Sequence, residues 1–234
     1  MRSKVIFLLL TIFCVKTPAQ DKRTVKFIDE YLNCASDNIN GKYGPVTKWD
    51  ANIKSLKYKI VGDQNFVNKK RWDNFISEIS QITGISLNRT EQNDYQILIY
   101  IGQFEDYQKI EKAKFSIDIR HNFGQWHWYT YNKNHSLKTY SHCIVPSKNH
   151  TPDKREFILK KALLNGLGLV GEIKDEYSIF YPFFLSSNKN LSRKDKRFIK
   201  LHYTKIITPG DNVSSLRKTL LELPEIEELS KEKI

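Results

Sequence analysis

The stretch KKALLNGLGLVGEIKDEYSIFYP, residues 160–182, decides the fold of this 234-residue chain. Upstream of it, Thr151-Pro152 supplies a helix N-cap and a proline at the first helical position. The pair Gly166 and Gly168 then supplies a helix end, because glycine adopts the left-handed conformation of helix C-termini without strain. The pattern predicts an apolar helix that ends at the glycine pair and is followed by a tight turn at Tyr181-Pro182.

Hydrophobic periodicity predicts the other elements. Alternating or continuous apolar runs, typical of strands, occupy residues 55–62, 95–102, 122–131 and 137–146. Amphipathic spacing, typical of helices, occupies residues 22–35, 65–84 and 190–203. This order predicts a single α+β domain with one mixed sheet and helices packed on it. The expected division is a leader (1–20), an N-terminal helix and linker (21–45), the main domain (46–210) and a charged helical tail that frays (211–234).

The first 20 residues have the plan of a secretory signal peptide. Arg2 and Lys4 precede an apolar run from Val5 to Val15, which is too short to span a bilayer. We therefore expect an exported protein, periplasmic or secreted. No lipid anchor is expected, because Phe13 stands before Cys14 where lipidation needs a small residue. No later stretch is long and apolar enough to cross a membrane.

Charge and cysteine content add two expectations. The formal net charge is +12, but the lysines are scattered, often beside acids, and form no stripe. We interpret this charge as a feature that keeps the protein soluble, and we expect no nucleic-acid partner. Cys34 and Cys143 remain after removal of the leader, and in an exported protein they either form a disulfide or stay free. The sequence leaves both possibilities open.

Three segments in chain order carry a resemblance to a known family. They are ILKKALLNGLGLVGE (158–172), YSIFYPFF (177–184) and LSRKDKRFIKLHY (191–203). Together they resemble the zinc helix, the Met-turn and the closing helix of zincin-like, matrixin-type metallopeptidase domains. The chain looks closer still to an uncharacterised family of exported bacterial proteins built on that plan. The resemblance covers roughly residues 48–210 and implies a zincin-like mixed β-sheet with packed helices.

The residues at the zinc positions do not suit the family's chemistry. Such a site needs two histidines at i and i+4 on one helix and a glutamate after the first. Aligning Gly168 with the family's glycine places the first ligand at Lys161, the base at Ala162 and the second ligand at Asn165. The third ligand position falls on Gly171. An ammonium repels a divalent metal, alanine accepts no proton, and the asparagine amide is neutral.

The resemblance therefore implies a non-catalytic pseudo-peptidase that uses no cofactor and binds a peptide, a protein or another ligand. Lys161 and Asn165 lie one helical turn apart and are expected to offer a cation and an amide to an anionic group, such as a peptide carboxylate. Glu172 and Tyr181 are further candidates in the same cleft. Phe180 takes the place of the Met-turn methionine.

Trp126 and Trp128 are candidate binding residues on one face of a strand. In matrixin-like folds the strand that borders the cleft lies about here and binds extended peptide by strand addition. The alternative is that the two indoles pack beneath a helix.

Two other functions stay open at this stage. One is an active zinc-dependent metallopeptidase or other hydrolase whose ligands lie elsewhere, with His142, Cys143 and His150 as the nearest set. The other is a structural component of a periplasmic or surface assembly that uses the aromatic strand.

Overall fold

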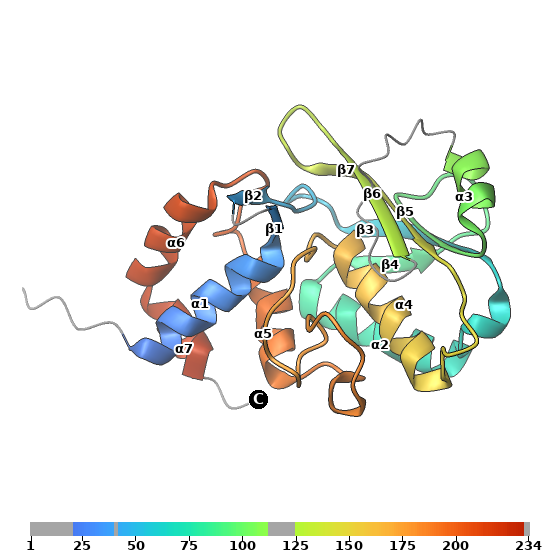
Figure 1. Cartoon of the computed structure of the whole chain (residues 1–234). Helices are drawn as coiled ribbons and strands as arrows, with labels where there is room; N and C mark the ends of the chain where they lie inside the picture. Colours follow the sequence, from blue (N-terminus) through green and yellow to red (C-terminus); the bar gives the residue numbers. More distant parts are fainter. Residues whose placement is uncertain (1–20, 40–41, 112–124, 232–234) are drawn as a thin grey trace, which may run out of the picture.

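The computed structural model describes residues 21–39, 42–111 and 125–231, so the predicted leader lies outside the described residues (Figure 1). Its main sheet has the strand order β4-β3-β5-β7-β6. These strands are β3 (Ser55–Gly62), β4 (Ser86–Arg89), β5 (Ile97–Ile101), β6 (Gln125–Tyr131) and β7 (Leu137–Ile144). All neighbours are parallel except β6, which runs antiparallel to β7 at one edge. The predicted α+β class with one mixed sheet is confirmed.

Helices surround this sheet. They are α1 (Lys22–Ala35), α2 (Lys69–Thr83), α3 (Phe104–Glu111), α4 (Pro152–Gly166), α5 (Arg193–His202), α6 (Val213–Glu222) and α7 (Pro224–Lys231). A small antiparallel hairpin, β1 (Ser36–Ile39) and β2 (Lys42–Val46), follows α1. The sequence patterns did not predict this hairpin, β4 or α3. Among the described residues, no helix is both long enough and apolar enough to cross a bilayer.

The central strand β5 is buried on both faces, as its continuous apolar run predicts. Because side chains alternate along a strand, Ile97 and Ile99 enter the main hydrophobic cluster on the side of α2 and α4. Leu98 and Tyr100 point the other way, into a second cluster that includes Tyr107 of α3. The sheet therefore packs a large hydrophobic cluster on the face of α2 and α4 and a small one on the face of α3.

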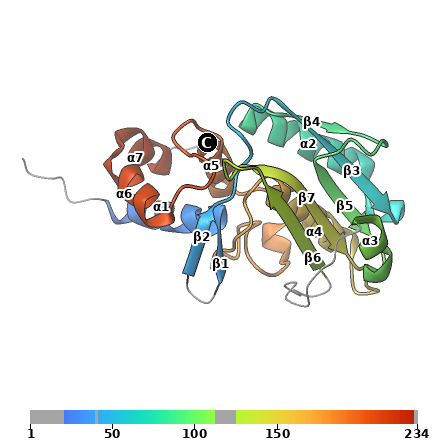
Figure 2. The same ribbon diagram turned by 90° about the horizontal axis from the view of Figure 1, so that it is seen from above.

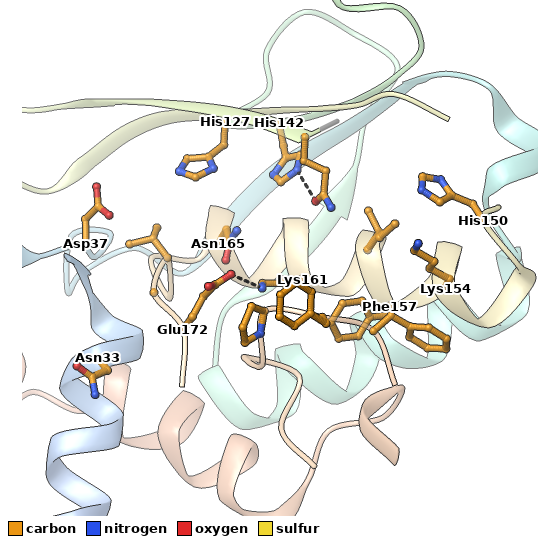
Figure 3. A pocket seen from close by; sticks show the side chains of 17 residues that line it. Asn33, Asp37, His127, His142, His150, Lys154, Phe157, Lys161, Asn165 and Glu172 are labelled. Carbon is orange, nitrogen blue, oxygen red and sulfur yellow. Dashed lines mark hydrogen bonds and ion pairs between the residues drawn. The ribbon is translucent and has the colours of Figure 1, made fainter. Parts of the chain in front are cut away.

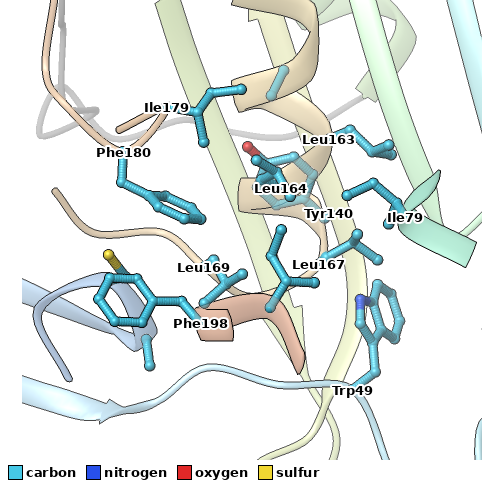
Figure 4. Packing of buried hydrophobic residues seen from close by; sticks show 14 of the residues in the cluster. Trp49, Ile79, Tyr140, Leu163, Leu164, Leu167, Leu169, Ile179, Phe180 and Phe198 are labelled. Atoms are coloured by element: carbon cyan, nitrogen blue, oxygen red, sulfur yellow. The ribbon is translucent and has the colours of Figure 1, made fainter. Parts of the chain in front are cut away.

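Helix α4 begins and ends where the sequence predicts. The Thr151 hydroxyl accepts the N–H of Lys154 (3.3 Å) as an N-cap, and Gly168 adopts a left-handed φ of +97° just beyond the end. The Trp49 indole N–H donates to the carbonyl of Gly166 (2.7 Å) and satisfies a group in the last turn. Figure 4 shows the leucines of α4 and of the segment after it packed among the sheet, Phe180 and Phe198. Each such buried side chain stabilises the fold by about 2 kcal/mol.

The N- and C-terminal helices form one group at the side of the sheet (Figures 1 and 2). Phe27 and Ile28 of α1 belong to the same hydrophobic cluster as Leu216 and Leu220 of α6 and Ile226 of α7. The predicted helical tail is therefore present, but residues 213–231 pack on α1 instead of fraying. Burial of these apolar side chains against α1 is the physical reason.

Cys34 and Cys143 are free and buried in this structure, so the disulfide that the sequence left open is not formed. Cys34 lies in the main cluster and Cys143 lies in the second cluster, on the other face of the sheet. Burial raises the pKa of the Cys143 thiol to about 12, which keeps it protonated and unreactive.

Candidate functional site

The turn that follows α4 is held by one buried carboxylate. Asp195, near the start of α5, accepts hydrogen bonds from the Ser178 hydroxyl and from the backbone N–H groups of Ile179 (3.1 Å) and Ser192 (2.8 Å). Phe180 is completely buried beside these contacts. Because Asp195 binds the turn and caps its own helix, it fixes the segment 175–181 beneath α4.

A cavity of about 640 Å³ lies between α4 and the edge of the sheet (Figure 3). The end of α1 and residues 182–184 close its sides. Its polar lining residues are Asn33, Asp37, Gln125, His127, His142, His150, Lys154, Lys161, Asn165 and Glu172, and its apolar ones include Phe157, Ile158, Pro182, Phe183 and Phe184. The structure thus brings together three of the four predicted cleft residues.

Lys161 is already paired inside this cavity. Its ammonium lies 2.8 Å from a carboxylate oxygen of Glu172 and donates to the backbone carbonyl of Tyr181 (3.2 Å). The Lys161 side chain is 12% exposed and that of Glu172 is 38% exposed. Tyr181 contributes this carbonyl and its side chain does not line the cavity; its ring packs against Phe183, with ring centroids 5.9 Å apart.

Gly171 has no room for a side chain. Its N–H donates to the carbonyl of Cys34 (2.9 Å), at the end of α1. A Cβ atom placed on Gly171 would lie 1.7 Å from the carbonyl oxygen of Asn33. The backbone of α1 therefore covers the position at which the family resemblance expects a third metal ligand.

Asn165 lies one turn beyond Lys161 and is only 6% exposed. Its side-chain oxygen Oδ1 has no hydrogen-bond partner in the part of the chain that the structure describes. Burial raises the pKa of the neighbouring Tyr140, and a side-chain hydrogen bond with Asn165 opposes this effect. The unpartnered oxygen belongs to a residue that lines the cavity, so a donor from a ligand is its natural partner.

A buried polar chain forms the wall opposite α4. The Tyr140 hydroxyl lies 2.8 Å from Nδ1 of His142, and Nε2 of His142 lies 3.2 Å from the Gln125 side-chain oxygen. Burial lowers the pKa of His142 well below its usual value, and the nearby His127 and Lys161 add to the effect. His142 is consequently a neutral imidazole whose two nitrogens both have partners.

Strand β6 borders the cavity, but the two predicted tryptophans point away from it. His127 lines the cavity, and by alternation Trp126 and Trp128 lie on the opposite face of the strand. Trp126 stacks on Phe104 of α3 with ring centroids 4.5 Å apart. Trp128 is 43% exposed. The packing alternative thus holds for Trp126, and neither indole contributes to the cleft.

The arrangement does not suit a zinc ion. Among the described residues, no group of three or more histidine, cysteine, aspartate or glutamate side chains is placed to hold a metal. His142 and His150 both line the cavity, whereas Cys143 belongs to the cluster on the other face of the sheet. The set suggested by their nearness in sequence is therefore split between two faces.

The chain matches no model of a known protein family and no curated protein. Figure 3 shows Asp37 and Glu172 towards one end of the cavity, and His150 and Lys154 at the other.

Sequence reasoning missed Asp37, Gln125, His127 and Lys154 as cavity residues. The alternation along residues 125–131 held a usable signal, since it places His127 on the face opposite the tryptophans. No sequence signal placed Asp37 at the cavity, because this residue reaches it only through the unpredicted hairpin after α1.

Proposed function

We propose that this chain is a zincin-like pseudo-peptidase, an exported protein that binds extended peptide in the cleft between β6 and α4 without hydrolysing it. The order of elements supports the family assignment. A helix ends at Gly166, just before the left-handed Gly168. The turn that follows buries Phe180 where the family has methionine, and Asp195 of the closing helix binds that turn. The sheet edge that borders the cavity is the antiparallel strand β6.

The observation that carries the non-catalytic assignment is the ion pair between Lys161 and Glu172. A zinc peptidase needs an empty space for the metal above its helix and three protein ligands around it. Here an ammonium stands at the first ligand position and bonds to Glu172 and to the Tyr181 carbonyl. The end of α1 occupies the third position, against Gly171. No group at position 162 accepts a proton from water, because the residue there is alanine.

Two features favour peptide as the ligand. Strand β6 is the last strand of the described sheet and borders the cavity, and sheets bind extended peptides by adding a strand at such a position. Across the cavity, Phe157, Ile158 and Phe184 supply an apolar wall for every second side chain of an extended ligand. The volume of this cavity is within the range typical of ligand sites, and its walls combine apolar side chains with polar groups.

The test uses purified residues 21–234 and a random-sequence peptide library. We expect substoichiometric zinc by elemental analysis, and we expect retained peptides to be recovered intact. Hydrogen exchange should slow in residues 125–131 and in the neighbouring part of α4 when peptide is bound. Stoichiometric zinc, together with peptide cleavage that chelation abolishes, would establish an active metallopeptidase instead. Protection confined to other surfaces would refute the cleft as the binding site.

A further inference from the structure

The end of the cleft beside the start of α4 is lined by an ammonium and an imidazole. Lys154 lies in the first turn of α4, and His150 lies just before that helix. Figure 3 shows both side chains at the opposite end of the cavity from Asp37 and Glu172. The two carboxylates among the lining residues therefore lie away from this end.

His150 presents a hydrogen-bond donor to the cavity. The residue is only 7% exposed, and its Nδ1 atom accepts the backbone N–H of Ser147 (3.3 Å). A ring nitrogen that accepts carries no proton, so the proton of the neutral ring is on Nε2. This second nitrogen has no hydrogen-bond partner within the described residues, yet it is not among the atoms that the protein encloses. Because His150 lines the cavity, its Nε2–H group is open to a ligand acceptor.

The charge of Lys154 is not balanced by a neighbouring acid. Within the part of the chain that the structure describes, its ammonium forms no hydrogen bond or ion pair. The acids nearest to it in α4, Asp153 and Glu156, both pair with Arg71 of α2. The ammonium is therefore available to an anion that enters the cavity.

A second cation adds to the positive charge at this end. Arg155 donates from Nε to the backbone carbonyl of His150 (2.9 Å). Burial lowers the pKa of His150, and the positive charges of Lys154 and Arg155 act in the same direction. Two cations therefore lie near a neutral imidazole that donates into the cavity, which is an arrangement that suits an anion.

The sequence predicted anion binding elsewhere in the same cleft, at Lys161. Of the two lysines that line the cavity, Lys161 already binds Glu172 and the Tyr181 carbonyl. An anion at Lys161 would have to compete with that carboxylate. At Lys154 it meets no such competitor among the described residues, so the favourable position for an anion is two helical turns earlier in α4.

We propose that the end of the cleft formed by His150 and Lys154 binds a carboxylate group of the peptide ligand. The imidazole N–H and the ammonium donate to the carboxylate oxygens, and the ammonium balances the negative charge. Phe157 lies three residues after Lys154 on α4 and offers an apolar contact beside the carboxylate. The group is either the C-terminal carboxylate or an acidic side chain, since both have this chemistry. The inference rests on the proposed function, because it assigns polarity to the same peptide-binding cleft.

The test uses two matched probes, 3-phenylpropionate and 3-phenylpropionamide, each titrated into ¹⁵N-labelled protein. They have the same shape and carry the same ring, but only the first has a negative charge. We expect the carboxylate to shift resonances of residues 150–158 and to bind about tenfold tighter than the amide, the difference that one hydrogen bond to a charged group produces. Lys154→Met and His150→Phe should each reduce that preference severalfold, and Lys154→Arg should keep most of it, because the charge remains.

The control variant is Lys70→Met, which removes one exposed lysine of α2 outside the cavity. It changes the net charge as Lys154→Met does, so an equal loss of preference in both variants would mean a long-range charge effect and would overturn the subsite. Melting curves show whether His150→Phe folds. Lys154 is only partly buried, so Lys154→Met tests the subsite without a change in the hydrophobic core.

A peptide experiment separates this subsite from the proposed function. Amidation of the C-terminus should weaken binding of library peptides if the terminal carboxylate is bound, and replacing aspartate and glutamate by their amides should do so if a side chain is bound. If neither change matters, or if 3-phenylpropionate binds no better than its amide, the carboxylate subsite is refuted, while intact peptides in the cleft still support the proposed function. If no peptide protects the cleft from exchange, the proposed function itself fails.

Discussion

Replacing Gly171 by alanine should destabilise the fold far more than the same change at Gly84. An added Cβ at Gly171 would lie 1.7 Å from the carbonyl oxygen of Asn33 and 2.8 Å from that of Ser36. Neither oxygen belongs to a flexible side chain, so the end of α1 must move until both distances exceed 3.0 Å. That movement stretches or breaks the hydrogen bond from the Gly171 N–H to the carbonyl of Cys34.

The magnitude follows from these two contributions. A lost backbone hydrogen bond costs about 1 kcal/mol, and forcing a packed helix out of its place costs about 1–3 kcal/mol. The free energy of unfolding of Gly171→Ala should therefore fall by about 2–4 kcal/mol. Gly84 is the matched control, because it has a φ of +71° and nothing within 4 Å of an added Cβ. Only backbone strain acts there, at about 1 kcal/mol.

Urea unfolding followed by tryptophan fluorescence measures both losses, since Trp49 and Trp72 are buried. Hydrogen exchange adds a local readout, because Gly171→Ala should speed exchange in α1 and Gly84→Ala should not. Equal losses of unfolding free energy in the two variants would refute the conclusion that α1 covers this position.

Three further predictions concern other parts of the structure. Lys161→Met should lower the free energy of unfolding by about 1–2 kcal/mol, because it breaks the pair with Glu172. Lys57→Met breaks an exposed pair with Asp94 and should lower it by under about 0.5 kcal/mol. A larger loss in Lys57→Met than in Lys161→Met would contradict the ion-pair assignment. Asp195→Asn should lower the free energy of unfolding by about 2–3 kcal/mol, because the carboxylate accepts hydrogen bonds from both the turn and the start of its own helix. A loss under about 0.5 kcal/mol in urea unfolding would show that Asp195 does not hold the turn. Burial lowers the pKa of His202 to about 3 in the folded chain, so between about pH 6.5 and that value only the unfolded chain takes up a proton there. The free energy of unfolding should therefore fall on acidification from pH 7 to 5, by at most about 1.4 kcal/mol per pH unit. If the slope of unfolding free energy against pH is unchanged in His202→Leu, this residue is excluded as the cause.

The sequence predicted the elements that have clear local signals, such as a helix cap or a continuous apolar run. The cap at Thr151 and the glycine at 168 place α4 correctly, and the continuous apolar run of β5 identifies the central strand. The strand β4 escaped prediction because it is short and has a single buried side chain, Leu87. The first hairpin escaped because Gly44 and Pro45 are typical of turns, yet here they lie within β2.

The cleft was only partly predictable for a different reason. Lys161, Asn165 and Glu172 could be placed together because they lie on one helix and the loop that follows it. The pairing of Lys161 with Glu172 depends on the path of that loop around Gly171. Asp37 enters the cleft from a segment that is more than 80 residues away from β6 in sequence, although its carboxylate accepts a bond from Tyr129 of that strand (3.3 Å).

In the proposed zincin-like interpretation, the close approach of α1 is physically linked to the residues that stand at the zinc positions. With a ligand-bearing side chain at position 171, the carbonyl of Asn33 could not approach as it does, because even a Cβ would lie 1.7 Å from it. With glycine there, the helix end reaches hydrogen-bond distance, and Cys34 accepts the Gly171 N–H. The same approach places Asn33 and Asp37 in the lining of the cleft that also contains Lys161 and Glu172. The helix end that leaves no room for a side chain at position 171 therefore also supplies part of the cleft lining. Histidines at positions 161 and 165 alone would leave a metal with two protein ligands, because position 171 stays closed until α1 moves.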